Sequence, residues 1–175
     1  MKRLSCWLAV CIAGALLVSA AKAQQPPQPG PEHAKFKELE GNWEATMEFQ
    51  GQKSTGAMTY KVIMGGFYLA SEFKGDFGGM KFEGRGLDTY DPMKKKYVGT
   101  WADNMAPGIM MMEGTYDKDG KKLTMSGEGP GPDGKPTKYT SITEMPDKNT
   151  MVFKMYMGGD TQGPPAFTIN YKRKQ

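Results

Sequence analysis

The stretch GNWEATMEFQGQKSTGAMTYKVIM, residues 41–64, alternates apolar and polar side chains along two runs. In the first run Trp43, Ala45 and Met47 alternate with polar neighbours, and in the second run Met58 and Tyr60 do the same. A period of two is typical of a β-strand with one face buried and one face in water. The glycine-containing break between the runs favours a tight turn, so this stretch predicts a β-hairpin.

Similar alternating runs fill the chain beyond residue 64. Turn-forming pairs such as Asp119-Gly120 and Asp133-Gly134 separate them at intervals of about 12 to 15 residues. No interval between them is suited to a crossover helix, so the strands should run antiparallel beside their neighbours in sequence. Closing so long a meander removes its exposed edges. We therefore predict an all-β fold: a single antiparallel up-and-down barrel of about ten strands with a short N-terminal helix. The expected strands are 43–50, 58–64, 67–74, 80–89, 96–102, 109–116, 121–127, 138–145, 151–157 and 166–173.

The first 23 residues have the features of a secretory signal peptide. Lys2 and Arg3 precede an apolar run, and Ala21-Lys22-Ala23 forms a small-x-small cleavage motif. A membrane anchor is the alternative, but a span needs about 20 apolar residues and this run is shorter. We expect cleavage near Ala23, a secreted or periplasmic protein, and no integral membrane span after cleavage.

The residues that follow divide into a tether and a barrel domain. Residues 24–30, QQPPQPG, are expected to be a disordered proline-rich tether. Residues 31–41, PEHAKFKELEG, predict a short helix that begins at Pro31 and ends before Gly41. We place the barrel domain at residues 31–175.

Composition excludes several classes of chemistry. Both cysteines, Cys6 and Cys11, lie in the expected signal peptide, so the mature chain has no thiol for a disulfide, a nucleophile or a metal ligand. The formal net charge is +4, but loss of Lys2, Arg3 and Lys22 with the signal leaves 20 basic side chains against 19 acidic ones. This balance gives no support for a nucleic-acid partner.

Three stretches carry a resemblance to known families. The run PEHAKFKELEGNWEA (31–45) contains a Gly-x-Trp opening at Trp43, which resembles that of the lipocalin and calycin barrels. Together with FEGRGLDTYDPMKKKYVGTWAD (82–103) and LTMSGEGPGPDGK (123–135), it is similar to the bacterial secreted family labelled domain of unknown function 1579. The resemblance implies a lipocalin-like barrel in which Arg173, near the chain end, stacks on Trp43 as a structural pair. That family has no agreed activity, so the resemblance implies no catalytic residue.

The sequence gives little support for nucleophilic or haem chemistry. His33 is the only histidine, and we expect it to face solvent on the N-terminal helix. No Gly-x-Ser-x-Gly motif accompanies it. Barrels of similar kind can hold haem through a histidine inside the sheet, and no histidine falls within the expected strands. We predict no catalytic residues, no metal site and no cofactor.

Acidic residues within the expected strands are the remaining candidates for catalysis, since glycoside chemistry needs two carboxylates that face a sugar. Most of them alternate with apolar residues, which indicates the outer, solvated face. The acids considered are Glu72, Glu83, Asp88, Glu113, Glu128 and Glu144.

Methionine is unusually abundant, with 15 residues in the chain. Clustered thioethers can bind Cu(I), but without histidine or cysteine in the barrel the ligands would be weak. We favour the interpretation that methionines fill the interior or line an adaptable pocket. The methionines expected to point inward are Met47, Met58, Met64, Met80, Met110, Met112, Met125, Met151, Met155 and Met157.

These patterns lead to three hypotheses for function. We favour a barrel that binds a small, largely apolar molecule in its interior, because ten strands leave space at the centre. The alternatives are an enzyme, a hydrolase or isomerase that uses carboxylates in the cavity, and a structural or interaction barrel of the cell envelope. The expected ligand-binding residues are Met58, Tyr60, Tyr97, Trp101, Met110, Met112, Tyr139, Phe153 and Met155.

Overall fold

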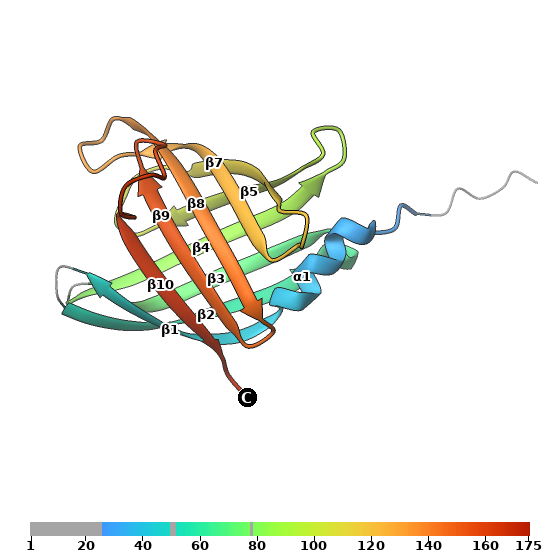
Figure 1. Cartoon of the computed structure of the whole chain (residues 1–175), viewed down its shortest axis with the longest axis horizontal. Helices are drawn as coiled ribbons and strands as arrows, with labels where there is room; N and C mark the ends of the chain where they lie inside the picture. Colours follow the sequence, from blue (N-terminus) through green and yellow to red (C-terminus); the bar gives the residue numbers. More distant parts are fainter. Residues whose placement is uncertain (1–25, 50–51, 78) are drawn as a thin grey trace, which may run out of the picture.

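A computed structural model of the chain describes residues 26–49, 52–77 and 79–175. Within them ten strands form a closed, entirely antiparallel barrel in which each strand pairs with its neighbours in sequence and β1 pairs with β10. Figure 1 shows this closure, with β1 and β10 side by side. The predicted fold class is confirmed. The strands are β1 (Gly41–Phe49), β2 (Gln52–Ile63), β3 (Tyr68–Phe77), β4 (Met80–Asp91), β5 (Lys96–Asp103), β6 (Met110–Tyr116), β7 (Lys122–Pro130), β8 (Pro136–Asp147), β9 (Thr150–Met157) and β10 (Phe167–Arg173).

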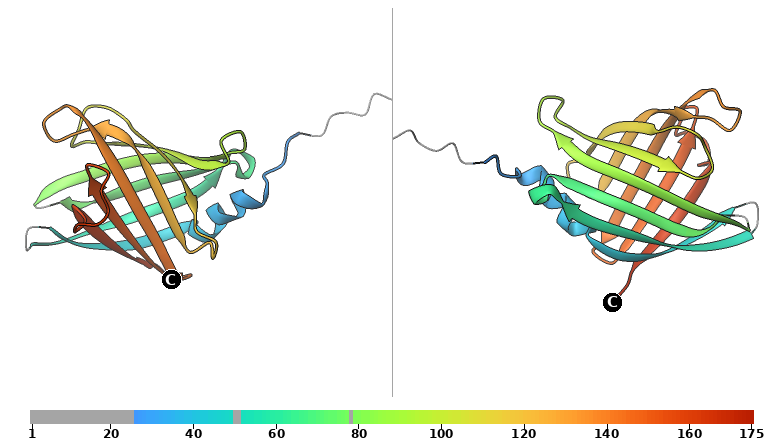
Figure 2. Two further views of the ribbon diagram at one scale, coloured as in Figure 1. Left: turned by 45° about the horizontal axis from the view of Figure 1, so that its top comes forward. Right: turned by 180° about the vertical axis from the view of Figure 1, so that it is seen from behind.

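Two short helical elements precede the barrel and a third interrupts it. The 3₁₀ turn η1 (Pro31–His33) leads directly into the helix α1 (Ala34–Leu39), and η2 (Met64–Gly66) connects β2 to β3. Both views in Figure 2 keep α1 at one end of the barrel, and the loops after β7 and β9 lie at the opposite end (Figure 1). Among the described residues no helix is long and apolar enough to cross a membrane. The expected signal peptide, residues 1–23, lies outside the described residues, so its cleavage stays a prediction.

The period of two in the sequence matches the burial of β1. Trp43, Ala45 and Met47 are buried, whereas Glu44 and Glu48 are exposed. Cross-strand pairing extends the same inward phase around the barrel, because directly opposed residues share a face. Trp43 is opposite Met58 on β2, which in turn is opposite Phe73 on β3.

The core is a continuous cluster of buried side chains that runs from the helix into the barrel. Phe36 and Leu39 of α1 belong to it, as do methionines of several strands. The inward methionines Met47, Met58, Met125, Met151 and Met155 are buried, as expected.

Three other methionines that were expected to point inward are exposed. Met64, Met80 and Met157 have exposed fractions of 64%, 52% and 41%. Met64 begins the turn η2, Met80 is the first residue of β4, and Met157 is the last residue of β9. Met157 is opposite the buried Tyr139 and so shares the inward phase, but at the end of a strand fewer side chains cover it. Alternation therefore gives the face of a residue at a strand end without giving its burial.

Candidate functional site: the barrel interior

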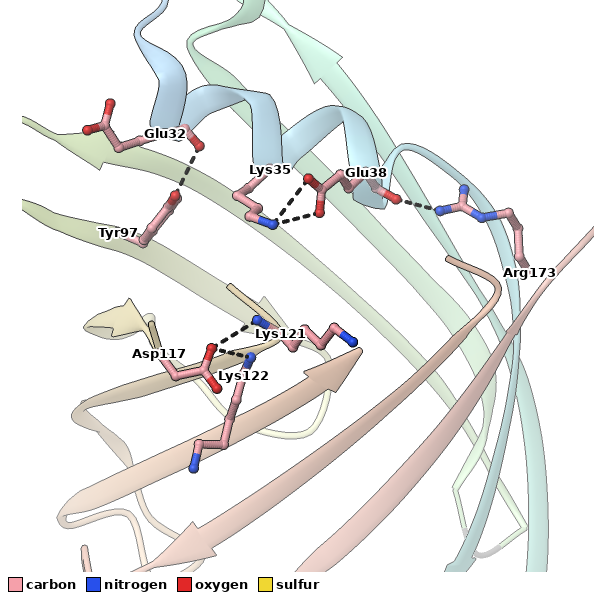
Figure 3. Close-up of polar contacts among 8 residues, drawn as sticks. All are labelled: Glu32, Lys35, Glu38, Tyr97, Asp117, Lys121, Lys122 and Arg173. Atoms are coloured by element: carbon pink, nitrogen blue, oxygen red, sulfur yellow. Dashed lines mark hydrogen bonds and ion pairs between the residues drawn. The ribbon is translucent and has the colours of Figure 1, made fainter. Parts of the chain in front are cut away.

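The end of the barrel beneath α1 is closed by packing and by hydrogen bonds. The indole Nε1 of Trp43 donates to the carbonyl of Leu39 over 2.9 Å. Arg173 stacks on the Trp43 ring, with 4.1 Å between the guanidinium carbon and the ring centroid, and donates to the carbonyls of Glu38, Glu40 and Lys148. Figure 3 shows Arg173 reaching Glu38 and Tyr97 reaching Glu32, so both ends of the helical segment are tied to the barrel. The Trp43–Arg173 contact implied by the resemblance is present.

His33 is part of this closed end, which corrects the expectation that it faces solvent. Its exposed fraction is 9%, and its Nδ1 accepts a hydrogen bond of 3.1 Å from the backbone N–H of Gly30. Its ring makes edge contacts with Phe36, Phe67 and Tyr90. His33 is buried because η1 continues the inward face of α1 across the barrel end. The spacing of His33, Phe36 and Leu39 at three-residue intervals is the sequence signal for this face.

The expected ligand-binding residues all lie in or against the barrel wall. Met58, Tyr97, Tyr139 and Met155 are buried, Tyr60, Trp101, Met112 and Phe153 pack against the core, and Met110 is half-buried. The structure brings some of them together in cross-strand pairs: Trp101 is opposite Met110, and Gly127 lies between Met112 and Tyr139.

The tyrosine hydroxyls in that set differ in their partners. The hydroxyl of Tyr97 donates to the carbonyl of Glu32 over 3.0 Å, and burial raises the pKa of Tyr97 to about 12. The hydroxyl of Tyr139 donates to the carbonyl of Pro130 over 2.7 Å. These two hydroxyls hold the helix and a hairpin loop, whereas that of Tyr60 has no protein partner among the described residues.

Asp88 on β4 also faces the interior, although its sequence context suggested the outer face. It is opposite Gly99 on β5, between the inward pairs Gly86–Trp101 and Tyr90–Tyr97. A methyl group on Gly99 would lie 2.1 Å from Asp88 Oδ1, so the carboxyl occupies the space that a side chain at position 99 would need. Burial raises the pKa of Asp88 to about 7.

Tyr60, an expected ligand-binding residue, lies near this carboxyl together with Tyr116 and Tyr171, which the sequence analysis did not single out. Burial raises the pKa of Tyr60 well above its ordinary value, and charges on Tyr171, Asp88 and Tyr116 would raise it further. Burial is also the main cause of the raised pKa values of Tyr116 and Tyr171. These four groups therefore lie close enough to interact electrostatically, and we call them the interior polar cluster.

The oxygens of the cluster are not fully enclosed by protein atoms. None of its four polar groups has a hydrogen bond to the described residues, and in that same part of the chain no fully enclosed polar side-chain atom lacks a partner. The oxygens of the cluster are therefore not sealed by protein atoms. Since they point inward, the surface they retain faces the barrel interior.

Neither Glu113, which the sequence analysis considered, nor Asp103, which it did not, forms a catalytic pair with Asp88. Hydrogen bonds from Lys94 and Lys96 lower the pKa of Glu113 to about 2 on the outer face. The inward acid Asp103 accepts a hydrogen bond from Trp101 and is opposite Gly84, four residues along β4 from Asp88. Four residues of strand span about 13 Å, which exceeds the carboxylate separation that glycosidases use.

The family model described as "Protein of unknown function (DUF1579)" matches residues 28–173. The chain belongs to this family. No curated protein matches the chain significantly. The DUF1579 barrel is similar to the crystal structure of Rv2717c from M. tuberculosis, with a TM-score of 0.61 and 12% identity over 83% of this chain and 99% of that one, which supports the fold alone.

Two redesigned barrels also resemble the DUF1579 chain, at lower structural similarity. One, b11L5F_LGL, has a TM-score of 0.44 and 16% identity over 80% of this chain and 95% of its own. The other, mFAP0 bound to DFHBI, has a TM-score of 0.42 and 16% identity over 78% of this chain and 99% of its own.

The substitution Asp88→Asn is expected to stabilise the DUF1579 barrel at pH 8 and to have a much smaller effect at pH 4. The ordinary carboxyl pKa is 3.8 and that of folded Asp88 is about 7, so between these values the folded chain holds a proton that the unfolded chain has lost. The contribution of Asp88 to stability therefore falls as the pH rises through this range. Since one pKa unit corresponds to about 1.4 kcal/mol, we expect the difference between D88N and wild type to grow by about 4 kcal/mol from pH 4 to pH 8.

Urea denaturation of both proteins across this pH range measures the effect. Glu83→Gln, which removes an exposed acid on the outer face of the same strand, is the matched control and should show no comparable trend. A D88N-to-wild-type difference that stays constant from pH 4 to pH 8 would contradict the raised pKa.

Proposed function

We propose that this protein binds a small, largely apolar molecule inside the barrel. The observation that carries the proposal is the interior polar cluster: its oxygens face inward, lack protein partners among the described residues and are not sealed. If protein side chains filled the interior completely, these oxygens would need protein hydrogen-bond partners, because a buried polar group without a partner costs free energy.

The wall of the barrel interior suits an apolar ligand. Met112 and Trp101 pack against the core from β6 and β5, and Met155 lies on β9. A methyl group on Gly84 would lie 2.2 Å from the Trp101 ring. The indole therefore packs over the backbone of β4 at this glycine. Methionine adapts its shape to different partners, and such a pocket separates ligands that differ by one methylene by only about 1–3 kcal/mol.

Residues 1–23 support export, so we further propose that binding takes place in the periplasm or outside the cell. Native mass spectrometry of protein purified from its own compartment tests both proposals in one measurement. A chain mass that begins at Gln24 is expected, together with a co-purifying small molecule. A retained Met1 would contradict export.

Replacing Met155 or Met112 by lysine is expected to weaken binding of a whole series of fatty acids, isoprenoids and aromatic metabolites. A lysine ammonium on the interior wall would lose its hydration, and this desolvation costs far more free energy than the lost methionine contacts. Quenching of tryptophan fluorescence measures the affinities, since Trp101 lies on that wall. Glu48→Lys, on the exposed face of β1, is the control and should bind as the wild type does. The absence of any binder in such a screen, together with purified protein that carries no small molecule, would refute interior binding.

A further inference from the structure

The four groups of the interior polar cluster come from four different strands. Asp88 comes from β4, Tyr60 from β2, Tyr116 from β6 and Tyr171 from β10, so four strands around the barrel direct oxygen atoms toward one region. The close approach of Asp88 to Gly99 fixes the carboxyl against the wall, since that position has no side chain to displace it.

No cation of the described chain neutralises Asp88. Lys35 of α1 lies 5.5 Å from the Tyr116 ring centroid and pairs with Glu38 at 2.9 Å. Arg173 is committed to three carbonyl groups and to the ring of Trp43. A carboxylate without a hydrogen-bond donor or a cation is an unfavourable group to keep inside a protein.

On this basis, and resting on the proposed function, we propose that the preferred ligand is an apolar amine whose protonated nitrogen pairs with Asp88 inside the barrel. An ammonium supplies both the charge and the donors that the carboxylate lacks, and its remaining N–H groups can reach tyrosine oxygens. The tyrosine rings add a favourable surface for a cation. An anionic head group would face four oxygen-bearing groups and no free cation, and a neutral alcohol could supply one donor but no charge.

The groups that face Asp88 allow one clear pH dependence. Tyr60 and Tyr116 interact with Asp88, and Tyr171 interacts with Tyr60. Tyr90 lies two residues along the same inward face of β4, with Tyr97 opposite it and the ring of His33 in edge contact with it. Lys35 and Glu38 of α1 lie beyond Tyr116. Burial raises the pKa values of Tyr60, Tyr116 and Tyr171 above their ordinary range, so these hydroxyls stay neutral between pH 5 and pH 8. Ionisation of Asp88 is therefore the event that changes the charge of the cluster over this interval.

Three ligands with one ten-carbon chain and different head groups test the proposal: decylamine, decanol and decanoic acid, each below the concentration at which it aggregates. Binding is measured by calorimetry and by tryptophan fluorescence at pH 8 and pH 5.5. We expect decylamine to bind at least tenfold more tightly than decanol at pH 8. Because the alkylammonium stays charged while Asp88, with its pKa of about 7, becomes protonated, the amine affinity should fall about 30-fold at pH 5.5.

Variants of Asp88 assign the preference to this side chain. Asp88→Asn should reduce decylamine binding to the level of decanol and change decanol binding by less than about twofold, whereas Glu83→Gln should change neither. Asp88→Glu keeps the charge and should retain the preference for the amine. The pH dependence of the wild type provides a test that needs no variant to fold.

The outcomes separate this inference from the proposed function. Decanol or decanoic acid that binds as well as decylamine, with no effect of D88N, would overturn the amine preference and leave interior binding in place. Decanoic acid that binds best at pH 5.5 would make protonated Asp88 a donor to a neutral or acidic ligand, and would also overturn it. If none of the three binds and the purified protein carries nothing, the proposed function fails and this inference fails with it.

Discussion

Replacement of Gly127 by alanine is expected to destabilise the barrel by more than about 4 kcal/mol, or to prevent its folding. Gly127 lies on β7 opposite Met112, and a methyl group there would be 1.8 Å from the backbone carbonyl oxygen of Met111. The obstacle is the main chain of the adjacent strand rather than the end of a flexible side chain. Relief therefore requires β6 and β7 to separate, with loss of the ladder that closes this part of the barrel.

Urea denaturation followed by circular dichroism measures the cost of this methyl group. Gly114→Ala should behave similarly, because a methyl group there would lie 1.8 Å from the carbonyl oxygen of Thr124 on the same pair of strands. Gly163→Ala is the matched control: nothing lies within 4 Å of a methyl group at that position, so the change should stay within about 0.5 kcal/mol. A G127A protein within 1 kcal/mol of wild type would show that the strands can separate at little cost.

The fold could be predicted from sequence because the two signals that define it are local. Alternation around Trp43 and Met47 gives the strand and its buried face, and turn-forming pairs give the connections. The ends of the strands were predicted less accurately. β8 begins at Pro136 rather than Lys138, since the N–H of Gly131 donates to the carbonyl of Lys135 over 2.7 Å and the hairpin ladder continues up to this tight turn.

The inward position of Asp88 agrees with the alternation along β4 and conflicts only with its charge. Phe82 and Tyr90 share its face and pack against the core, whereas the opposite face carries exposed residues such as Glu83. An acid in a strand is normally assigned to the solvated face, because a buried carboxylate is costly. The pairing of Asp88 with Gly99 on β5, which has no side chain, leaves room for the carboxyl inside.

Tyr116 and Tyr171 were missed for a different reason. Their alternation places them correctly inside the barrel, but sequence does not show which inward tyrosines meet one another. That depends on the register between strands distant in the chain, because β6 and β10 face each other only after closure. His33 is a similar case, since its burial follows from how η1 crosses the barrel end.

Trp43 and Arg173 join the first strand to the last, and their removal is expected to have the second largest effect on stability. Trp43 is 1% exposed, and its ring contacts the helix through Nε1 and the guanidinium through its face. Truncation of a buried tryptophan costs about 3–5 kcal/mol. Since Trp43→Ala also removes the stacking contact, we expect about 5 kcal/mol for this variant.

A double-mutant cycle isolates the contact between the two side chains. Arg173→Ala should cost about 3 kcal/mol, because three backbone carbonyls lose a charged donor, and the cycle with Trp43→Ala should return a coupling of about 1–2 kcal/mol. Arg173→Lys should recover only a minor part of the loss, since an ammonium cannot stack on the indole while it reaches the carbonyls of Glu38, Glu40 and Lys148. Lys172→Ala, on the exposed face of the same strand, is the control and should stay within about 0.5 kcal/mol. Urea denaturation of the set gives all four values, and a coupling below about 0.3 kcal/mol would mean that Arg173 acts on the carbonyls alone, with the indole contributing only its buried surface.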